Sequence, residues 1–272
     1  MYRILKKETY SPSTYMWVVE APDIAAAARA GQFVIVCHNE TAERIPLTIA
    51  DFDVEAGTIT LVVQAVGKST IEMMTYNEGD HIRDLVGPLG EASHIEPLET
   101  VVFVGGGLGV APVYPILREF KLKGSHTISI LGFRTREIMF WQERFARYSD
   151  ELIITTDDGS CGEKGLVTVP LQRLISRRRV DHVVAIGPLI MMRACAEVTR
   201  PHGIPTVVSL NPIMVDGTGM CGSCRVTVGD EVKFSCIDGP DMDGHLVNFD
   251  ELMNRQKRFD KYEKVATKKY GR

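Results

Sequence analysis

The stretch Val101-Val-Phe-Val-Gly-Gly-Gly-Leu-Gly-Val-Ala-Pro112 decides the fold of this chain. Its apolar residues predict a buried strand, and its glycines allow a tight turn whose backbone amides can approach an anion closely. From Pro112 to Leu122 the residues have helical character. A strand, a glycine-rich turn and a helix in this order are typical of a domain that binds the diphosphate of a nucleotide.

Toward the C-terminus, short apolar runs alternate with helical segments. After the first run come apolar runs at 126–133, 151–158, 181–188 and 205–212, and helical segments at 112–122, 138–148, 168–179 and 189–200. This alternation predicts a parallel, doubly wound sheet over 98–212. Its ligands are expected at the carboxyl ends of the strands.

The N-terminal third has a different pattern. Segments 15–21 and 32–38 are rich in β-forming residues, and 46–66 predicts a hairpin around Ala56-Gly57. Closely spaced strands with glycine punctuation predict a small antiparallel barrel over 1–97.

Composition narrows the class of protein. With 44% hydrophobic residues and a net charge of −4, the chain is ordinary for a globular protein and offers no electrostatic case for binding nucleic acid or an anionic membrane. No apolar run is long enough to span a membrane, and the N-terminus has no apolar signal segment, so we expect a cytoplasmic protein. Of the six cysteines, three are scattered and three fall together, which favours reduced thiols and a metal site over disulfides.

The three clustered cysteines lie in 213–250, which we predict to be a separate cluster-binding subdomain. Asp216-Gly-Thr-Gly-Met-Cys221-Gly-Ser-Cys224 is followed by Cys236. The spacing is that of plant-type [2Fe–2S] proteins, with aspartate in the first position. Three thiolates and one carboxylate would supply the four anionic ligands that two irons need. Zinc held by Cys3Asp remains an alternative, although zinc sites usually carry two paired knuckles.

Two motifs in the predicted barrel suit a flavin nucleotide. In Arg44-Ile-Pro-Leu-Thr48 the arginine can neutralise a diphosphate, and the threonine hydroxyl can reach a flavin ring nitrogen. Val66-Gly-Lys-Ser-Thr70 opens a helix whose free amides suit a phosphate. Ser69 and Glu72 also have the spacing of an ordinary capping box, so both interpretations of this turn stay open.

The glycine-rich turn departs from G-x-G-x-x-G, because Val110 stands in the last position. No acid ends the second strand of the sheet, where a ribose-binding carboxylate is usual. Asp157 and Asp158, after the third strand, can take that role or form a capped turn before Gly159.

The C-terminal part contains a predicted hairpin and a basic tail. Residues 225–236 predict a hairpin that turns at Gly229-Asp230. Residues 254–272 hold eight Lys or Arg and two acids, within a tail that we place at 251–272. This tail is either a solvated helix or a segment that packs against another protein near the cluster.

The motifs occur together in a known order. R-x-P-L-T, the G-K-S-T turn, G-P-L-G at 87–90, G-G-G-x-G-x-A-P and I-G-P at 186–188 resemble the ferredoxin–NADP reductase superfamily. With the Asp/Cys3 segment, the chain is similar to the small subunits of NADH-dependent reduced ferredoxin:NADP oxidoreductase, also known as sulfide dehydrogenase small subunits. The runner-up is the electron-transfer subunit of dihydroorotate dehydrogenase, whose four-cysteine pattern differs at position 216.

The resemblance implies three cofactors. FAD would lie in the barrel, against Arg44, Pro46, Leu47, Thr48, Gly67, Lys68, Ser69 and Thr70. NAD(H) would bind near Gly106, Gly107, Gly109 and Pro112, with Ile186 where many superfamily reductases have a cysteine. Hydride exchange would take place at FAD beside Thr48, and single electrons would pass through the [2Fe–2S] cluster.

The resemblance also implies a partner, a larger subunit with its own flavin and iron–sulfur clusters, in which electron bifurcation occurs. Asp216, Cys221, Cys224 and Cys236 would hold the cluster of this chain. A rival of another class is a zinc-stabilised, non-catalytic nucleotide-binding module, which would be colourless where the oxidoreductase would be yellow-brown.

Overall fold

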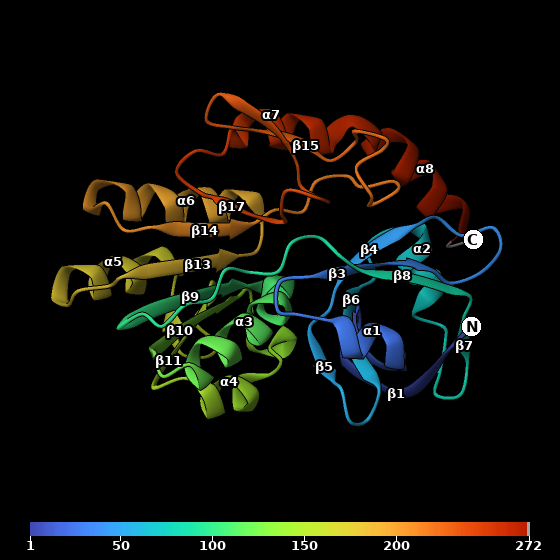
Figure 1. Cartoon of the computed structure of the whole chain (residues 1–272), viewed down its shortest axis with the longest axis horizontal. Coiled ribbons are helices and arrows are strands. Elements are labelled where there is room, and N and C mark those ends of the chain that lie inside the picture. Colours follow the sequence, from blue (N-terminus) through green and yellow to red (C-terminus); the bar gives the residue numbers. More distant parts are fainter. Residues whose placement is uncertain (271–272) are drawn as a thin grey trace.

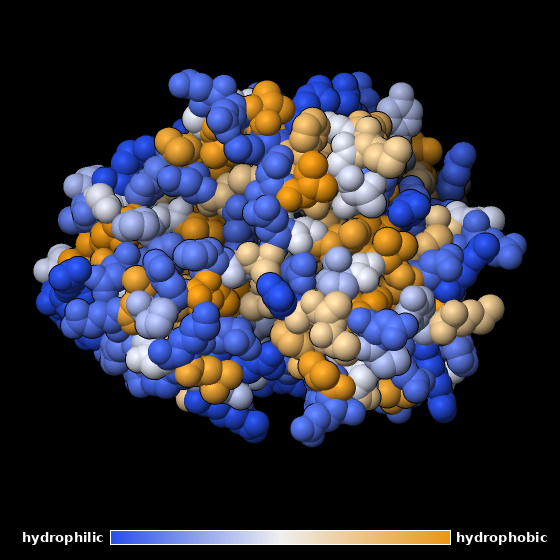
Figure 2. Space-filling view, in the orientation of Figure 1, coloured by the Kyte–Doolittle hydropathy of each residue, from blue (hydrophilic) through white to orange (hydrophobic). Residues whose placement is uncertain are grey.

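The computed structural model describes residues 1–270 of the chain. A barrel lies beside a larger sheet domain, and the C-terminal segment runs across the top of both (Figure 1). The face in Figure 2 is mostly hydrophilic, with apolar residues in patches between the polar ones. Within residues 1–270, no helix combines the length and apolar character needed to cross a membrane.

The barrel consists of two antiparallel sheets with the orders β5-β6-β2-β1-β7 and β4-β3-β8. Apolar side chains from both sheets meet in one core, where Trp17, Val34 and Leu61 are fully buried. The elements are β1 (Tyr2–Ser11), β2 (Thr14–Glu20), α1 (Pro22–Ala27), β3 (Phe33–Cys37), β4 (Ile45–Thr48), β5 (Asp51–Asp53), β6 (Thr58–Gln64), α2 (Lys68–Met73), β7 (His81–Ile82) and β8 (Asp84–Leu89). The predicted antiparallel barrel is confirmed.

The second domain is a seven-stranded sheet with the order β12-β11-β10-β9-β13-β14-β17. Six of its strands run parallel, and β17 pairs antiparallel with β14. The strands are β9 (Thr100–Gly106), β10 (His126–Phe133), β11 (Glu151–Thr156), β12 (Glu163–Lys164), β13 (His182–Ile186), β14 (Thr206–Ser209) and β17 (Asp241–Asp243). All five predicted apolar runs form strands, whereas β12 and β17 were not predicted.

Helices cover both faces of this sheet, as expected of a doubly wound fold. Val101 and Phe103 of β9 pack with α3 and α4, whereas Val102 and Val104 pack with α5 and α6. Both faces of a central parallel strand are therefore buried, and its sequence is continuously apolar. The helical elements are η1 (Gly107–Gly109), α3 (Val110–Leu122), η2 (Arg136–Ile138), α4 (Gln142–Tyr148), α5 (Thr168–Arg177), α6 (Leu189–Thr199) and η3 (Arg200–His202).

The C-terminal segment contains the cysteine loop, a hairpin and two helices. The hairpin turns at Gly229 as predicted, between β15 (Arg225–Val228) and β16 (Glu231–Phe234). After β17 come α7 (Phe249–Gln256), η4 (Lys257–Phe259) and α8 (Asp260–Tyr270). The predicted tail is therefore helical over its described residues, and α8 packs against α2 of the barrel. Arg272 lies outside the described residues.

The capping box proposed for Ser69 and Glu72 is wrong. Helix α2 begins at Lys68, with Gly67 at its N-cap, so Ser69 lies inside the first turn. The Gly67 amide donates instead to the Thr70 hydroxyl oxygen, at 3.1 Å. Thr70 occupies the third helical position, where a side chain can reach back to the N-cap amide.

Candidate functional site

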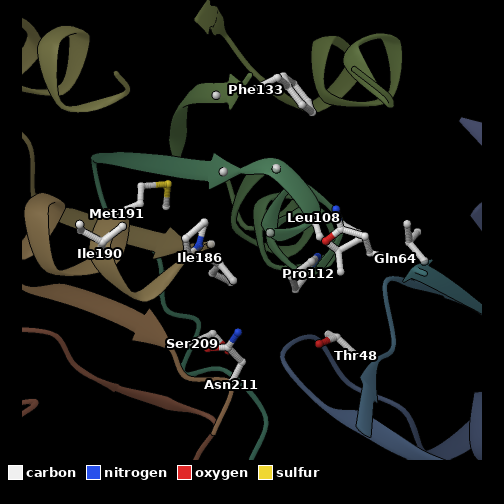
Figure 3. A pocket seen from close by; sticks show the side chains of 18 of the residues that line it. Thr48, Gln64, Leu108, Pro112, Phe133, Ile186, Ile190, Met191, Ser209 and Asn211 are labelled. Atoms are coloured by element: carbon white, nitrogen blue, oxygen red, sulfur yellow. The ribbon is translucent and has the colours of Figure 1, made fainter. Parts of the chain in front are cut away.

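A cavity of about 990 Å³ lies between the barrel and the sheet domain. Numbered by their sequence, the parallel strands β11-β10-β9-β13-β14 are arranged in the order 3-2-1-4-5. Successive strands are therefore added on one side of β9 up to β11, and on its other side from β13 onward. Ligands of such folds bind at this switch point, outside the carboxyl ends of the strands. Thr48 and Gln64 come to the cavity from the barrel, and Leu108, Pro112 and Ile186 from the sheet domain (Figure 3).

The glycines at the end of β9 have distinct structural reasons. A Cβ at Gly109 would lie 2.1 Å from the backbone oxygen of Ile186, so this position packs directly against β13. A Cβ at Gly106 would meet the Met191 sulfur at 2.2 Å. Gly107 has φ +54°, a conformation that favours glycine. Close packing against the backbone therefore accounts for Gly109, and the turn itself for Gly107, whereas the contact at Gly106 is with the flexible end of the Met191 side chain.

The cavity gathers part of the predicted site. Its lining includes the predicted residues Pro46, Leu47, Thr48, Gly106, Gly107, Gly109, Pro112 and Asp157. It also includes residues that the sequence did not single out, among them Gln64, Phe133, Ile190, Met191, Ser209 and Asn211. Ser209 and Asn211 could have been predicted from the sequence, because polar residues that end a parallel strand face the ligand edge of the sheet.

The predicted diphosphate residues lie outside this cavity, which reaches the turn only through Val66. The Ser69 hydroxyl is buried and donates to Glu43 Oε2 at 2.7 Å. The Thr70 hydroxyl accepts from the Gly67 amide. Both hydroxyls are thus engaged within the chain, whereas Lys68 is exposed.

Arg44 is exposed just before β4 and reaches the cysteine loop. Its Nη2 lies 3.4 Å from the backbone oxygen of Asp216. The arginine proposed for the flavin diphosphate is therefore next to the aspartate proposed for the cluster.

The two candidate ribose ligands differ in position. Asp157 lines the cavity. Asp158 does not; its Oδ1 accepts from the Ser160 amide at 2.9 Å and from the Ser160 hydroxyl, and these bonds hold its pKa below the ordinary value. Gly159 follows with φ +79°. The structure favours the capped-turn interpretation for Asp158 and leaves Asp157 as the candidate.

The cysteine loop brings its four candidate ligands into one segment. Cys224 and Cys236 are buried, with their sulfurs 3.2 Å apart, and Cys221 is exposed. The Asp216 carboxylate accepts from the Thr218 amide at 2.8 Å and from the Cys221 amide at 2.7 Å. These bonds lower the pKa of Asp216, so the side chain is an anion at neutral pH.

Three thiols and a carboxylate, the donors in this loop, are chemically suited to an iron–sulfur cluster. Gly217, Gly219 and Gly222 have φ of +76°, +84° and +66°, which lets the backbone wrap closely around a bound group. Burial, followed by the neighbouring Cys224, raises the pKa of Cys236 to about 12, so metal binding there must displace a proton. In the part of the chain that the structure describes, no three His, Cys, Asp or Glu side chains are arranged to hold a metal ion.

The comparisons with known proteins agree with this geometry. Residues 211–248 match the family model described as the iron–sulfur cluster binding domain of dihydroorotate dehydrogenase B. An uncharacterized protein in the adh 3' region of Clostridium beijerinckii is 49% identical over 265 residues, covering 94% of this chain and 90% of that protein. A homolog of the dihydroorotate dehydrogenase B (NAD(+)) electron transfer subunit from Thermotoga maritima is 44% identical, covering 98% of this chain and 94% of that one.

A solved structure is equally similar. The structure of NADH-dependent reduced ferredoxin–NADP oxidoreductase, described for flavin-based electron bifurcation, matches with a TM-score of 0.95 and 43% identity. The match covers 100% of this chain and 98% of that chain. The chain therefore belongs to the ferredoxin–NADP reductase superfamily, in its family of small electron-transfer subunits, and is an oxidoreductase subunit with an iron–sulfur domain.

Proposed function

We propose that the chain carries electrons between NAD(H) and a larger flavoprotein subunit, as the small subunit of an electron-bifurcating ferredoxin:NADP oxidoreductase. It works with FAD, NAD(H) and one [2Fe–2S] cluster. The observation that carries this proposal is the cavity in which Thr48 of the barrel faces Pro112, in the first turn of α3. A flavin on one wall and a nicotinamide on the other would meet there.

The chain supplies binding and orientation. Bound FAD and the iron–sulfur cluster supply the redox chemistry. FAD exchanges a hydride with nicotinamide, and the two electrons of that hydride pass one at a time through the cluster. Thr48 presents a hydroxyl on the flavin side, and Gly106, Gly107 and Gly109 form the turn that lines the nucleotide side. The iron–sulfur cluster is held by Cys221, Cys224, Cys236 and Asp216. Arg44, which lies beside the cysteine loop, neutralises the FAD diphosphate.

Asp216 supports the bifurcating enzyme over the dihydroorotate dehydrogenase subunit, because that subunit is expected to have cysteine in this position. The match to the bifurcating oxidoreductase along the full chain supports the same choice. The family model of the cluster domain and the name of the Thermotoga relative favour the second candidate, a dihydroorotate dehydrogenase subunit.

The test starts with the isolated chain. A yellow-brown protein with flavin and iron–sulfide bands that NADH bleaches anaerobically is expected; a colourless zinc protein would contradict the proposal. A pull-down from native extract then identifies the partner. Reduction of NADP by reduced ferredoxin with NADH as co-donor supports the first candidate, and NAD-dependent oxidation of dihydroorotate supports the second.

A further inference from the structure

An ionic cluster joins the barrel to the sheet domain beside the cavity. Asp51, the first residue of β5, accepts a hydrogen bond from Arg118 of α3, and its Oδ2 lies 3.3 Å from Nη1 of Arg144 in α4. The Asp51 side chain is 21% exposed, and that of Arg118 16%. Two arginines from one domain thus share a partly buried carboxylate from the other.

Aromatic contacts hold both arginines in place. Arg118 lies over the Phe52 ring, with its guanidinium carbon 5.2 Å from the ring centroid. Arg144 lies over the Trp141 ring at 4.5 Å. Because guanidinium groups stack on aromatic faces, each arginine keeps a fixed orientation when it meets the carboxylate.

A second contact between the domains lies next to this cluster. The Trp141 indole nitrogen donates to the Tyr10 hydroxyl of β1 at 2.7 Å, and Tyr10 stacks on Phe140. Trp141 has φ +65°, which non-glycine residues seldom adopt. A strained backbone persists where its surroundings fix it, and the hydrogen bond to Tyr10 is part of those surroundings.

In each domain, the residues of this ionic cluster are close in sequence to a residue that lines the cavity. On the barrel side, Thr48 precedes Asp51 by three residues, and the intervening Ile49 and Ala50 are buried. On the other side, Pro112 precedes Arg118 on the same helix, by about 9 Å of helix length. The contact between Asp51 and Arg118 therefore links the barrel segment that carries Thr48 to the helix that carries Pro112.

We infer that Asp51 is a positioning residue, which through Arg118 and Arg144 sets the separation between the flavin wall and the nicotinamide wall. This inference rests on the proposed function. Hydride transfer depends steeply on donor–acceptor distance, and a displacement of about 1 Å can lower a rate by about a hundredfold. Loss of these ionic contacts slows hydride transfer, while FAD and NADH still bind.

The experiment uses the full-length chain loaded with FAD and mixed anaerobically with NADH. Asp51→Ala is expected to lower the limiting rate of flavin reduction by about ten- to a hundredfold. The FAD content and the NADH concentration at half-maximal rate are expected to change by less than about threefold, because Asp51 is absent from the cavity lining. The primary isotope effect with C4-deuterated NADH should rise.

Two further variants isolate the cause. Asp51→Glu keeps the charge and is expected to recover most of the rate. Lys121 lies on α3, as Arg118 does, but its ion pair stays within the sheet domain: its Nζ is 2.6 Å from Asp150 Oδ1. Lys121→Gln removes that ion pair. This control is expected to react like wild type.

The outcomes separate the two proposals. If the wild-type chain binds no FAD or is not reduced by NADH, the proposed function is overturned and the positioning role with it. If wild type reacts normally and Asp51→Ala reacts equally fast per bound flavin, the positioning role alone is overturned. A loss of FAD and of thermal stability at an unchanged rate per flavin would mean a merely structural contact.

Discussion

Arg44 Nη2 and the backbone oxygen of Asp216 lie 3.4 Å apart, although 172 positions separate the two residues in the chain. One belongs to the turn before β4 of the barrel, the other to the loop that carries the cysteines. The segment that we propose to bind FAD and the segment that we propose to hold the cluster are therefore in contact. A direct contact of this kind suits electron transfer between the two cofactors.

Replacing Arg44 tests the flavin side of this contact. Arg44→Ala is expected to weaken FAD binding about tenfold or more, because a charge-assisted bond to the diphosphate is lost. Arg44→Lys should retain more affinity than Ala. Fluorescence titration of the deflavinated chain measures the change, and iron and sulfide analysis should show the cluster intact. Arg83→Ala, another exposed arginine of the barrel, is the control. Unchanged affinity for Arg44→Ala would remove this residue from the FAD site.

The cysteine ligands can be tested one by one. Cys→Ala at 221, 224 or 236 is expected to abolish the [2Fe–2S] absorbance and EPR signal, because no neighbouring thiol can replace the lost thiolate. Cys161→Ala, outside the loop, should keep full cluster content. Full iron and sulfide content in all three loop variants would show that the assignment is wrong.

Asp216 has two possible roles, which a pair of variants separates. Asp216→Cys is expected to keep a cluster with a different reduction potential and EPR line shape, because sulfur replaces oxygen on one iron. Asp216→Asn keeps an acceptor for only one of the two amides, because Thr218 donates to Oδ1 and Cys221 to Oδ2, and it loses the anionic ligand, so cluster content should fall. If the Asn variant keeps the native spectrum, Asp216 only shapes the loop.

The main elements of the fold could be predicted from local sequence. The apolar run 101–104 and its glycine turn are interpretable because a central parallel strand is buried on both faces. Strand β1 was missed because four of its ten residues are charged, and its pairing with β2 defines it. Strand β17, Asp-Met-Asp, forms only where β14 offers a free edge.

The candidate site was only partly predictable, for a related reason. Motifs such as Arg44–Thr48 carry their own chemical signal. The contacts of Asp51 with Arg118 and Arg144, and of Arg44 with Asp216, depend on how distant segments pack together. Single residues of ordinary type give no sign of such contacts in the sequence.

A buried carboxyl at the junction of the domains predicts a pH-dependent stability. Asp241 is partly buried in β17 beside β14; its carboxyl oxygen Oδ1 is buried, and its Oδ2 accepts from the Ser93 hydroxyl at 2.6 Å. Burial raises its pKa, so the folded chain keeps this proton at pH values where the unfolded chain, with an ordinary pKa of about 3.9, has lost it. The carboxyl therefore costs stability progressively as pH rises above about 4 and up to the folded pKa.

Asp241→Asn removes this cost and keeps an acceptor for Ser93. We expect the variant to unfold at higher urea concentration than wild type at pH 7, with the difference shrinking as the pH falls toward 4. Urea titrations at several pH values measure it. A difference that stays constant with pH would mean that Asp241 does not titrate in this range.

The basic tail gives the last prediction. Helix α8 packs against α2, and its described part carries Lys261, Lys264, Lys268 and Lys269 on an exposed surface. An exposed cationic helix attracts an acidic partner at long range, and salt screens that attraction. We therefore expect removal of residues 260–272 to weaken assembly with the larger subunit about tenfold at low salt and less at high salt.

The truncated chain should still reduce ferricyanide with NADH, because the cavity lining contains no residue of α8. Its FAD content is measured in the same samples, since α8 contacts α2 next to the proposed diphosphate turn. Co-expression with the partner, followed by dissociation measurements at several salt concentrations, gives the affinities. If the truncated chain assembles as tightly as the full chain at every salt concentration, α8 is only a solvated helix.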